Sequence, residues 1–257
     1  MSLVRLGIED PVYHAAIGPS TFGADNWGKI NHFDQVLDGE PIGRGVAFEK
    51  GEIYRSFKMV FNKGRSWTDT PFFKGAARRI ARGERLWNCT TPEELRERLE
   101  RDIGALHRSM RTHGFLSQAQ IARRAADDPA QDADIAAFAR PDYPSRIRDN
   151  HEIKLGVNEA GDLLFLDGRH RFAVARLLRL SGIPCRIVFR HRDWVDQRRI
   201  LAEAATASAG DATPLYAPEH PDLTGLRLSA PALLQAARQL NAEGWSAPPV
   251  RMLRTAA

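Results

Sequence analysis

The chain has 257 residues, of which 43% are hydrophobic, so it can bury at least one good core and falls between one large domain and two small ones. Its 37 Lys and Arg residues face 32 Asp and Glu residues, for a formal net charge of +5. This near balance permits nucleic acid as a partner without indicating it. The sequence has neither a signal-peptide pattern nor an apolar run of about 18 residues, which predicts a cytoplasmic protein with no membrane partner.

The first part of the chain, up to about residue 75, is rich in glycine and aromatic residues and shows little helical periodicity. It predicts loops with a few strands, among them a β-like run at 53–61, "IYRSFKMVF", with a glycine on either side. Residues 72–87 predict a helix. Four of its arginines recur at helical spacing: Arg78, Arg79, Arg82 and Arg85. Such a stripe either grips phosphates or forms a solvated helix face.

The segment from Thr91 to Gly114 carries the clearest helix signals. Thr91 can cap the free amides, Pro92 suits the first turn, and Glu94 completes a capping box. Five apolar residues then share one face: Leu95, Leu99, Ile103, Leu106 and Met110. This face predicts core packing. The alanine-rich, proline-broken stretch at 123–144 predicts a short helix and a connection.

A regular alternation of elements follows residue 147. We expect strands at 152–157, 163–167 and 183–191, a helix that starts at 169 and is ended by Gly182, and two further helices at 192–210 and 229–243. The apolar residues of the helix that starts at 169 share one half of its surface, so that half is expected to pack against the strands. Both cysteines, Cys89 and Cys185, are expected to be small buried hydrophobes, because two cysteines are too few for a disulfide framework or a four-cysteine zinc site.

The junction between the second of these strands and the following helix carries the strongest chemical signal, "LLFLDGRHRFAVARLL" at 163–178. Amides at a helix start carry partial positive charge, Gly168 allows close approach to the backbone, and Arg169 and Arg171 add forked donors that suit phosphate. Asp167 either coordinates Mg²⁺ or caps the helix. The turn is therefore a candidate polyphosphate site.

The same residues, followed by "IPCRIVF", resemble the nucleotide-binding core shared by ParB partition proteins, sulfiredoxins and free serine kinases. The resemblance covers about 148–191, under a fifth of the chain. The Asp-Gly-His-His-Arg type of motif of the free serine kinases is matched at Asp167, Gly168, His170 and Arg171. Sulfiredoxins carry their nucleophilic cysteine where this chain has Arg169, which argues against sulfinic-acid repair. ParB proteins have a further arginine where this chain has His170, and a helix-turn-helix that is not evident here.

The resemblance implies an α+β protein with three parts. Residues 143–200 would form a ParB/sulfiredoxin-like nucleotide-binding module, 1–142 an N-terminal α+β cap, and 201–257 a C-terminal helical extension. It implies a Mg²⁺-dependent small-molecule kinase or nucleotide hydrolase that uses ATP, ADP or CTP and, for a kinase, a hydroxylated metabolite. Two alternatives stay open: a ParB-like nucleotide switch that engages DNA or a protein partner, and a scaffold that has lost nucleotide binding.

Under the enzyme reading, which we favour, the residues take the following roles. Asp167 serves the metal or positions substrate; Gly168, Arg169, His170 and Arg171 hold phosphates; Arg190 and His191 are secondary phosphate ligands; and Glu152 is the base. Arg190 and His191 could instead form a solvated strand end, and Glu152 could be a surface carboxylate. We expect His170 to stay neutral between two arginines and to donate or accept hydrogen bonds.

Overall fold

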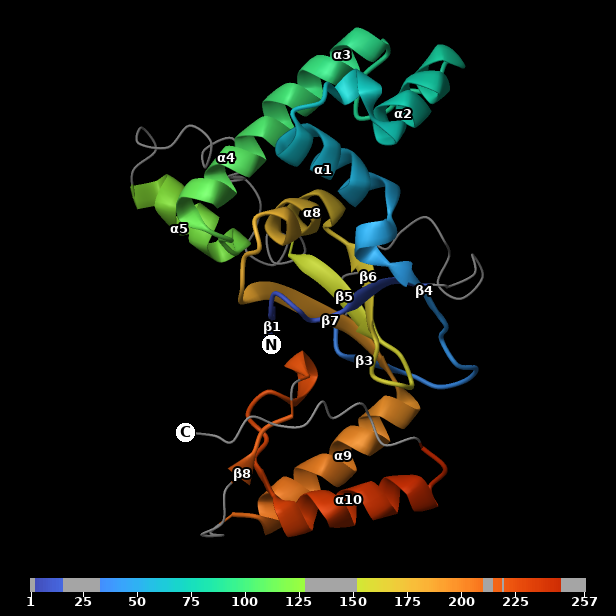
Figure 1. Cartoon of the computed structure of the whole chain (residues 1–257), viewed down its shortest axis with the longest axis vertical. Helices are drawn as coiled ribbons and strands as arrows, with labels where there is room; N and C mark the ends of the chain where they lie inside the picture. Colours follow the sequence, from blue (N-terminus) through green and yellow to red (C-terminus); the bar gives the residue numbers. More distant parts are fainter. Residues whose placement is uncertain (1–2, 16–32, 128–151, 210–214, 219, 246–257) are drawn as a thin grey trace.

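The computed structural model describes residues 3–15, 33–127, 152–209, 215–218 and 220–245. This part of the chain is mixed α+β, with a sheet between two groups of helices (Figure 1). The helices are α1 (Glu52–Lys63), α2 (Pro71–Ala81), α3 (Pro92–Arg98), α4 (Gly104–His113), α5 (Gln118–Asp127), α8 (Arg169–Leu177), α9 (Arg192–Ala207) and α10 (Ala230–Ala242). Short helical turns are η2 (Phe48–Lys50), η3 (Trp67–Asp69), η4 (Leu99–Ile103) and η5 (Pro221–Leu223).

The seven-stranded sheet combines strands from both sides of residue 142. Its strands are β1 (Val4–Leu6), β2 (Val12–Ala15), β3 (Gln35–Leu37), β4 (Arg44–Ala47), β5 (Ile153–Val157), β6 (Leu163–Asp167) and β7 (Ile183–His191), and β8 (Leu215–Tyr216) pairs with β9 (Leu228–Ser229) separately. The order is β1-β7-β5-β6-β2-β4, with β3 also on β7. The boundary predicted between 142 and 143 lies outside the described residues.

The centre of the sheet is the β-hairpin, helix and strand predicted after residue 147. β5 and β6 pair antiparallel, α8 follows, and β7 returns parallel to β5. The strands predicted at 152–157, 163–167 and 183–191 are confirmed, as is the helix between them, although α8 ends at Leu177, before Gly182. β2 then pairs parallel with β6, so that a strand from the start of the chain lies beside the motif.

The strand predicted at 53–61 is wrong, because these residues belong to α1. Its aromatic and β-branched residues suggested β-structure, but the apolar positions follow the helical repeat, with Phe57 buried and Ile53, Val60 and Phe61 partly buried against the same core. Gly64 ends the helix in the left-handed conformation (φ 62°). Packing against neighbouring helices thus overrode local β-propensity.

The helix predicted between Thr91 and Gly114 is confirmed, including the capping box of Thr91 and Glu94. It runs through α3 and α4 with one π-helical segment, η4, between them. All five residues of the predicted apolar face are buried. They join a core cluster that also contains the buried residues of α8 and of the central strands.

Helix α8 is covered on both sides, which its sequence pattern does not predict. One side lies on the sheet and the other contacts α1 and α4. Arg176 lies outside the apolar half of α8, yet its side chain is only 11% exposed and pairs with Glu49 at 2.7 Å. The segments packed on this side of α8, η2 among them, therefore bury Arg176 instead of leaving it in solvent.

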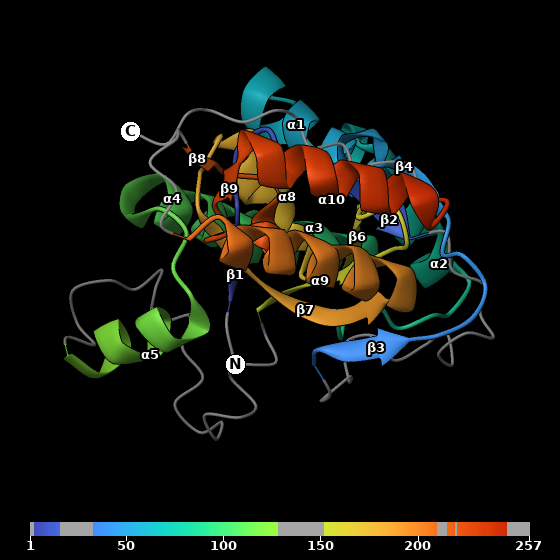
Figure 2. The ribbon, with the colours of Figure 1, turned by 90° about the horizontal axis from the view of Figure 1, so that it is seen from below.

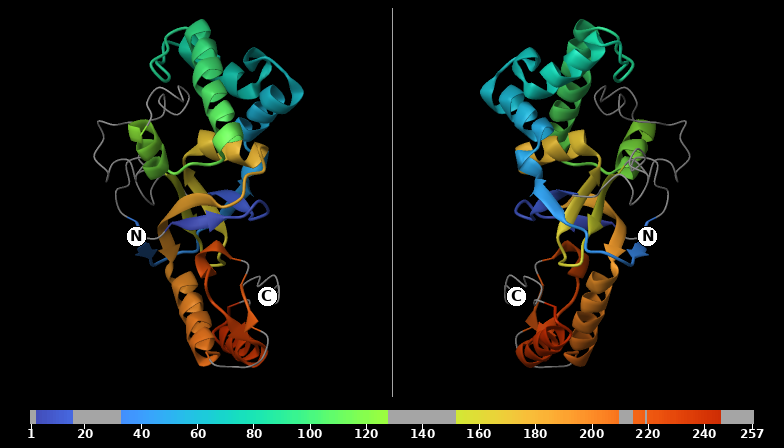
Figure 3. Two further views of the ribbon diagram at one scale, coloured as in Figure 1. Left: turned by 90° about the vertical axis from the view of Figure 1, so that its left-hand side faces the viewer. Right: turned by 90° about the vertical axis from the view of Figure 1, so that its right-hand side faces the viewer.

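The C-terminal helices pack at the opposite end of the sheet from α1–α4 (Figure 3). α9 follows β7 directly, and α10 lies beside it (Figure 2). Both predicted helices are thus confirmed, and both cysteines are free and buried. In the part of the chain that the structure describes, no helix has the length and apolar character needed to cross a membrane.

Candidate functional site

The strand-turn-helix junction depends on Gly168. This residue is left-handed (φ 89°), and a Cβ there would lie 3.1 Å from Cα of Ile153 and 3.0 Å from its Cγ1. Only glycine fits this turn without strain or a shift of β5. α8 starts at the next residue, and its N-cap residue, Gly168, supplies no side-chain cap. The free amides of its first turn and its dipole therefore favour an anion at this end.

Asp167 is tied to both sides of the turn. Its Oδ1 accepts the N–H of Gly168 at 2.7 Å, and Nζ of Lys154 lies 3.6 Å from its Oδ2. Lys154 is fully buried opposite Asp167 in the β5–β6 pairing, and burial lowers its pKa while Asp167 opposes that shift. The Asp167 side chain is 40% exposed, so it keeps acceptor capacity toward solvent.

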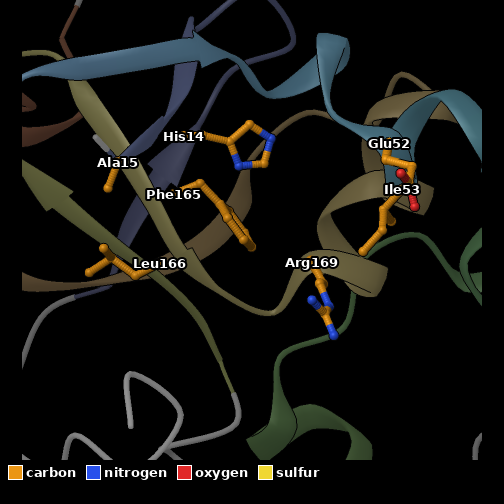
Figure 4. A pocket seen from close by; sticks show the side chains of 7 residues that line it. All are labelled: His14, Ala15, Glu52, Ile53, Phe165, Leu166 and Arg169. Atoms are coloured by element: carbon orange, nitrogen blue, oxygen red, sulfur yellow. The ribbon is translucent and has the colours of Figure 1, made fainter. Parts of the chain in front are cut away.

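Arg169 lines an open cavity of about 510 Å³ at the start of α8. The other lining residues come from β2, β6 and α1: His14, Ala15, Phe165, Leu166, Glu52 and Ile53. In Figure 4 the rings of His14 and Phe165 lie between Ala15 and Leu166 on one side and Glu52, Ile53 and Arg169 on the other. Arg169 is exposed and forms no ion pair with any described residue. Its guanidinium is thus available to a ligand.

Two polar residues of this cavity, His14 and Glu52, were missed by sequence reasoning. His14 pairs with Phe165 in the β2–β6 register and stacks on Phe48 at 5.3 Å, and its buried Nε2 has no hydrogen-bond partner among the described residues. Glu52 starts α1, is exposed, and forms no ion pair within the described chain. Neither residue sits in a motif, and only the tertiary fold brings them to Arg169.

Arg171, the second arginine of the motif, lies away from this cavity in a buried ion pair. Its Nη1 is 3.3 Å from Oε2 of Glu152, and its Nη2 donates to the carbonyl of Leu116 at 2.9 Å. Glu152 also accepts the N–H of Gln118 at 2.6 Å. Glu152 is only 3% exposed, so the surface-carboxylate alternative is wrong, and burial raises its pKa against the opposing effect of Arg171.

The His170 side chain lies among aromatic residues of α1, α2 and the segment that follows α2. Its ring stacks on Phe57 at 5.7 Å and meets Trp87 edge-on at 5.4 Å, and its buried Nε2 has no partner in the described structure. Its pKa is lowered to about 4, first by burial and second by Arg169. The residue is therefore neutral at pH 7 as expected, but burial rather than two flanking arginines is the main cause.

Arg190 and His191 are fixed by other parts of the chain. Arg190 donates to Asp222 at 2.8 Å and to Asp34 at 2.7 Å, while His191 accepts the N–H of Asp193 through Nδ1. Their side chains are 12% and 4% exposed, so the solvated-strand-end alternative is wrong. Neither residue lines the cavity beside Arg169.

Among the predicted site residues, the structure thus brings the Asp167–Gly168 turn and Arg169 to one open end of α8. It directs Arg171 with Glu152 into one buried network, and it ties Arg190 and His191 to different partners elsewhere. Within the described residues no three His, Cys, Asp or Glu side chains cluster as a ready-made metal cage. No family model, curated protein or solved structure matches the chain.

Proposed function

We propose that this protein binds a nucleotide with Mg²⁺ and transfers a phosphoryl group to a hydroxylated small molecule or to water. The observation that carries the proposal is the open cavity of about 510 Å³ at the start of α8, with Arg169 in its wall and, among the described residues, no carboxylate in an ion pair with it. Ligand sites of small molecules are concave and contain a few convergent polar groups, and this cavity has three polar lining residues, His14, Glu52 and Arg169. We also propose that these elements form a ParB/sulfiredoxin-like fold, and their order along the chain, β5, β6, α8 and β7, supports this.

The phosphates would lie at the N-terminal end of α8. The backbone amides of Arg169 and His170 supply donors, since that of Gly168 is bonded to Asp167, and the helix dipole adds partial positive charge there. Arg169 adds a full charge and a forked donor set. Gly168 keeps the turn free of a side chain, so a phosphate can approach the backbone. ATP, ADP and CTP all carry a polyphosphate chain that these donors could bind.

Mg²⁺, when bound with the phosphates, would neutralise part of their negative charge. A hard cation in that position is usually also coordinated by one or two carboxylates of the protein. Asp167 fits that role, since it lies at the turn and is partly exposed. Lys154 and the N–H of Gly168 would hold its carboxylate in one orientation.

The acceptor would occupy the part of the cavity near Glu52 and His14. In the transfer, the acceptor oxygen bonds to the terminal phosphorus, the bond from that phosphorus to the bridging oxygen breaks, and the acceptor proton leaves to a base. Glu52 suits the role of general base better than Glu152, because Glu152 is buried in an ion pair with Arg171 whereas Glu52 lines the cavity. His14 would orient the acceptor through a ring nitrogen.

Thermal unfolding against a nucleotide panel, with and without Mg²⁺, tests this function. A bound ligand at about 100 times its Kd stabilises the fold by about 2.7 kcal/mol, so at least one nucleotide should raise the Tm in a Mg²⁺-dependent way. Release of diphosphate nucleotide then separates an enzyme from a nucleotide switch. If no nucleotide changes the Tm, the proposal fails.

A further inference from the structure

Positive charge is concentrated in one two-helix segment of the chain. Residues 52–91, which contain α1 and α2, hold nine Lys and Arg residues but only three Asp and Glu residues, a net charge of +6. Because the whole chain carries +5, the other residues together carry −1. The near balance seen over the full sequence therefore hides a strongly basic region.

All of these basic side chains are exposed: Arg55, Lys58, Lys63, Arg65, Lys74, Arg78, Arg79, Arg82 and Arg85. Among the described residues, only Arg79 has a carboxylate partner, Glu84 at 2.6 Å. Two acids of η4 are taken by other arginines, since Glu100 pairs with Arg96 and Asp102 with Arg98. In α3, hydrogen bonds from Thr90 and also the charge of Arg85 lower the pKa of Glu94, without an ion pair to it among the described residues. The region thus presents open positive charge to a partner.

The cations form stripes on the outer sides of α1 and α2. Lys74, Arg78 and Arg82 recur every four residues, whereas the apolar side of α2, with Phe72 and Ile80, is buried. At about 1.5 Å per residue the stripe spans about 12 Å. The two helices adjoin, because Oε1 of Glu52 would lie only 3.7 Å from a Cβ placed on Gly75.

The side chains exposed on this surface favour one kind of polyanionic partner over others. No large hydrophobic side chain is exposed between 52 and 91. Membrane-surface helices insert apolar side chains, and sites for single-stranded nucleic acid offer aromatic rings on which bases stack. A surface on which exposed Lys and Arg outnumber exposed Asp and Glu nine to three suits the regularly spaced phosphates of a duplex.

We propose that α1 and α2 form a surface that binds double-stranded DNA through its phosphate backbone, independently of sequence. α2 lies at one end of the molecule (Figure 1), and the side chains of its basic stripe are exposed. The DNA major groove is about 12 Å wide and admits a helix, whereas the major groove of duplex RNA is too narrow for protein side chains. This activity is independent of nucleotide binding at α8.

Fluorescence anisotropy with a labelled mixed-sequence DNA duplex of about 20 base pairs tests the surface. The wild type should bind, and affinity should fall steeply between about 50 and 200 mM salt. The variant Lys74→Glu/Arg78→Glu/Arg82→Glu removes three phosphate contacts. Its slope of log K against log salt should be flatter by about 2.7, and at the lower salt its binding should drop at least tenfold.

A matched variant, Arg199→Glu/Arg227→Glu/Arg238→Glu, makes the same charge change at exposed positions near the other end of the molecule. It should retain most of the DNA affinity of the wild type, and circular dichroism should show that both variants are folded. Equal loss in the two variants would mean that only net charge matters, which overturns the proposal. It is also overturned if the wild type fails to bind DNA at the lower salt, or binds duplex RNA or anionic phospholipid vesicles in preference to it.

Discussion

Arg171 and Glu152 form an ion pair, 3.3 Å between Nη1 and Oε2, that is buried under the connection between α4 and α5. The two arginines of the motif thus have different surroundings: Arg169 lines the cavity, and Arg171 is locked inside the fold. Removing one partner of a buried pair leaves an uncompensated charge. Glu152→Gln is therefore expected to lower the free energy of unfolding by about 3 kcal/mol, measured by urea denaturation.

A double variant separates this structural role from a catalytic one. Replacing both partners, as in Glu152→Gln/Arg171→Met, removes the buried charge as well as the pair, so the stability lost in Glu152→Gln should be largely recovered. If Glu152→Gln unfolds like the wild type but abolishes phosphoryl transfer, Glu152 acts as the base after all and the assignment to Glu52 is wrong.

Asp222 is expected to fix the C-terminal segment through Arg190. Its side chain is 2% exposed, accepts from Arg190 and from Nε1 of Trp194, and has its pKa lowered by these partners against the effect of burial. Asp222→Asn should cost about 3 kcal/mol of stability in thermal or urea unfolding. Nucleotide binding at α8 should survive in the folded variant. Loss of binding with unchanged stability would show instead that Arg190 is a phosphate ligand.

Gly168→Ala should both destabilise the fold and perturb the turn. The left-handed backbone strains any side chain by about 1 to 2 kcal/mol, and here the new Cβ would also meet the backbone of Ile153 at 3.1 Å. Gly182→Ala is the control, because Gly182 is also left-handed (φ 67°) but its Cβ would meet only Arg5, at 3.9 Å. Urea unfolding should show a larger loss at Gly168. Equal losses would mean that the close approach to β5 is unimportant.

His170 makes stability depend on pH. Its pKa is about 4 in the folded protein and about 6.5 when unfolded, so only the unfolded chain gains this proton as pH falls. The contribution of neutral His170 to the free energy of unfolding is constant above about pH 6.5. About 3 kcal/mol of that free energy is lost as the pH falls from about 6.5 to about 4. His170→Phe keeps a ring among Phe57 and Trp87 but cannot titrate. Its stability should therefore fall less than that of the wild type over this range, and equal pH profiles would contradict the buried, neutral histidine.

The sequence predicted the regular elements well wherever local signals and packing agree. The capping box at Thr91, the apolar face of the following helix and the alternation after residue 147 all form as expected. The β-like run at 53–61 failed because β-branched and aromatic residues also occupy the buried side of α1. There, tertiary contacts rather than propensity decide the structure.

The surroundings of the charged motif residues were predicted less well, for a physical reason. A helical wheel shows that Arg171 and Arg176 oppose the apolar residues of α8. It does not show that Glu152, the carbonyl of Leu116 and Glu49 supply partners for that side. Likewise, His14 and Glu52 reach the cavity through strand pairing and helix packing that link distant segments. Local patterns carry no information about such contacts.

The most direct test of the phosphate site is the affinity of Arg169→Ala for Mg²⁺-ATP, or for the panel nucleotide that raises the Tm most, by isothermal titration calorimetry. A hydrogen bond to a charged group contributes about 1.5 to 3 kcal/mol, so the variant should bind about 10 to 100 times more weakly than the wild type. The control Arg238→Ala, at an exposed position of α10, should bind normally. Equal affinity in Arg169→Ala and the wild type would contradict the central claim that this guanidinium holds the phosphates.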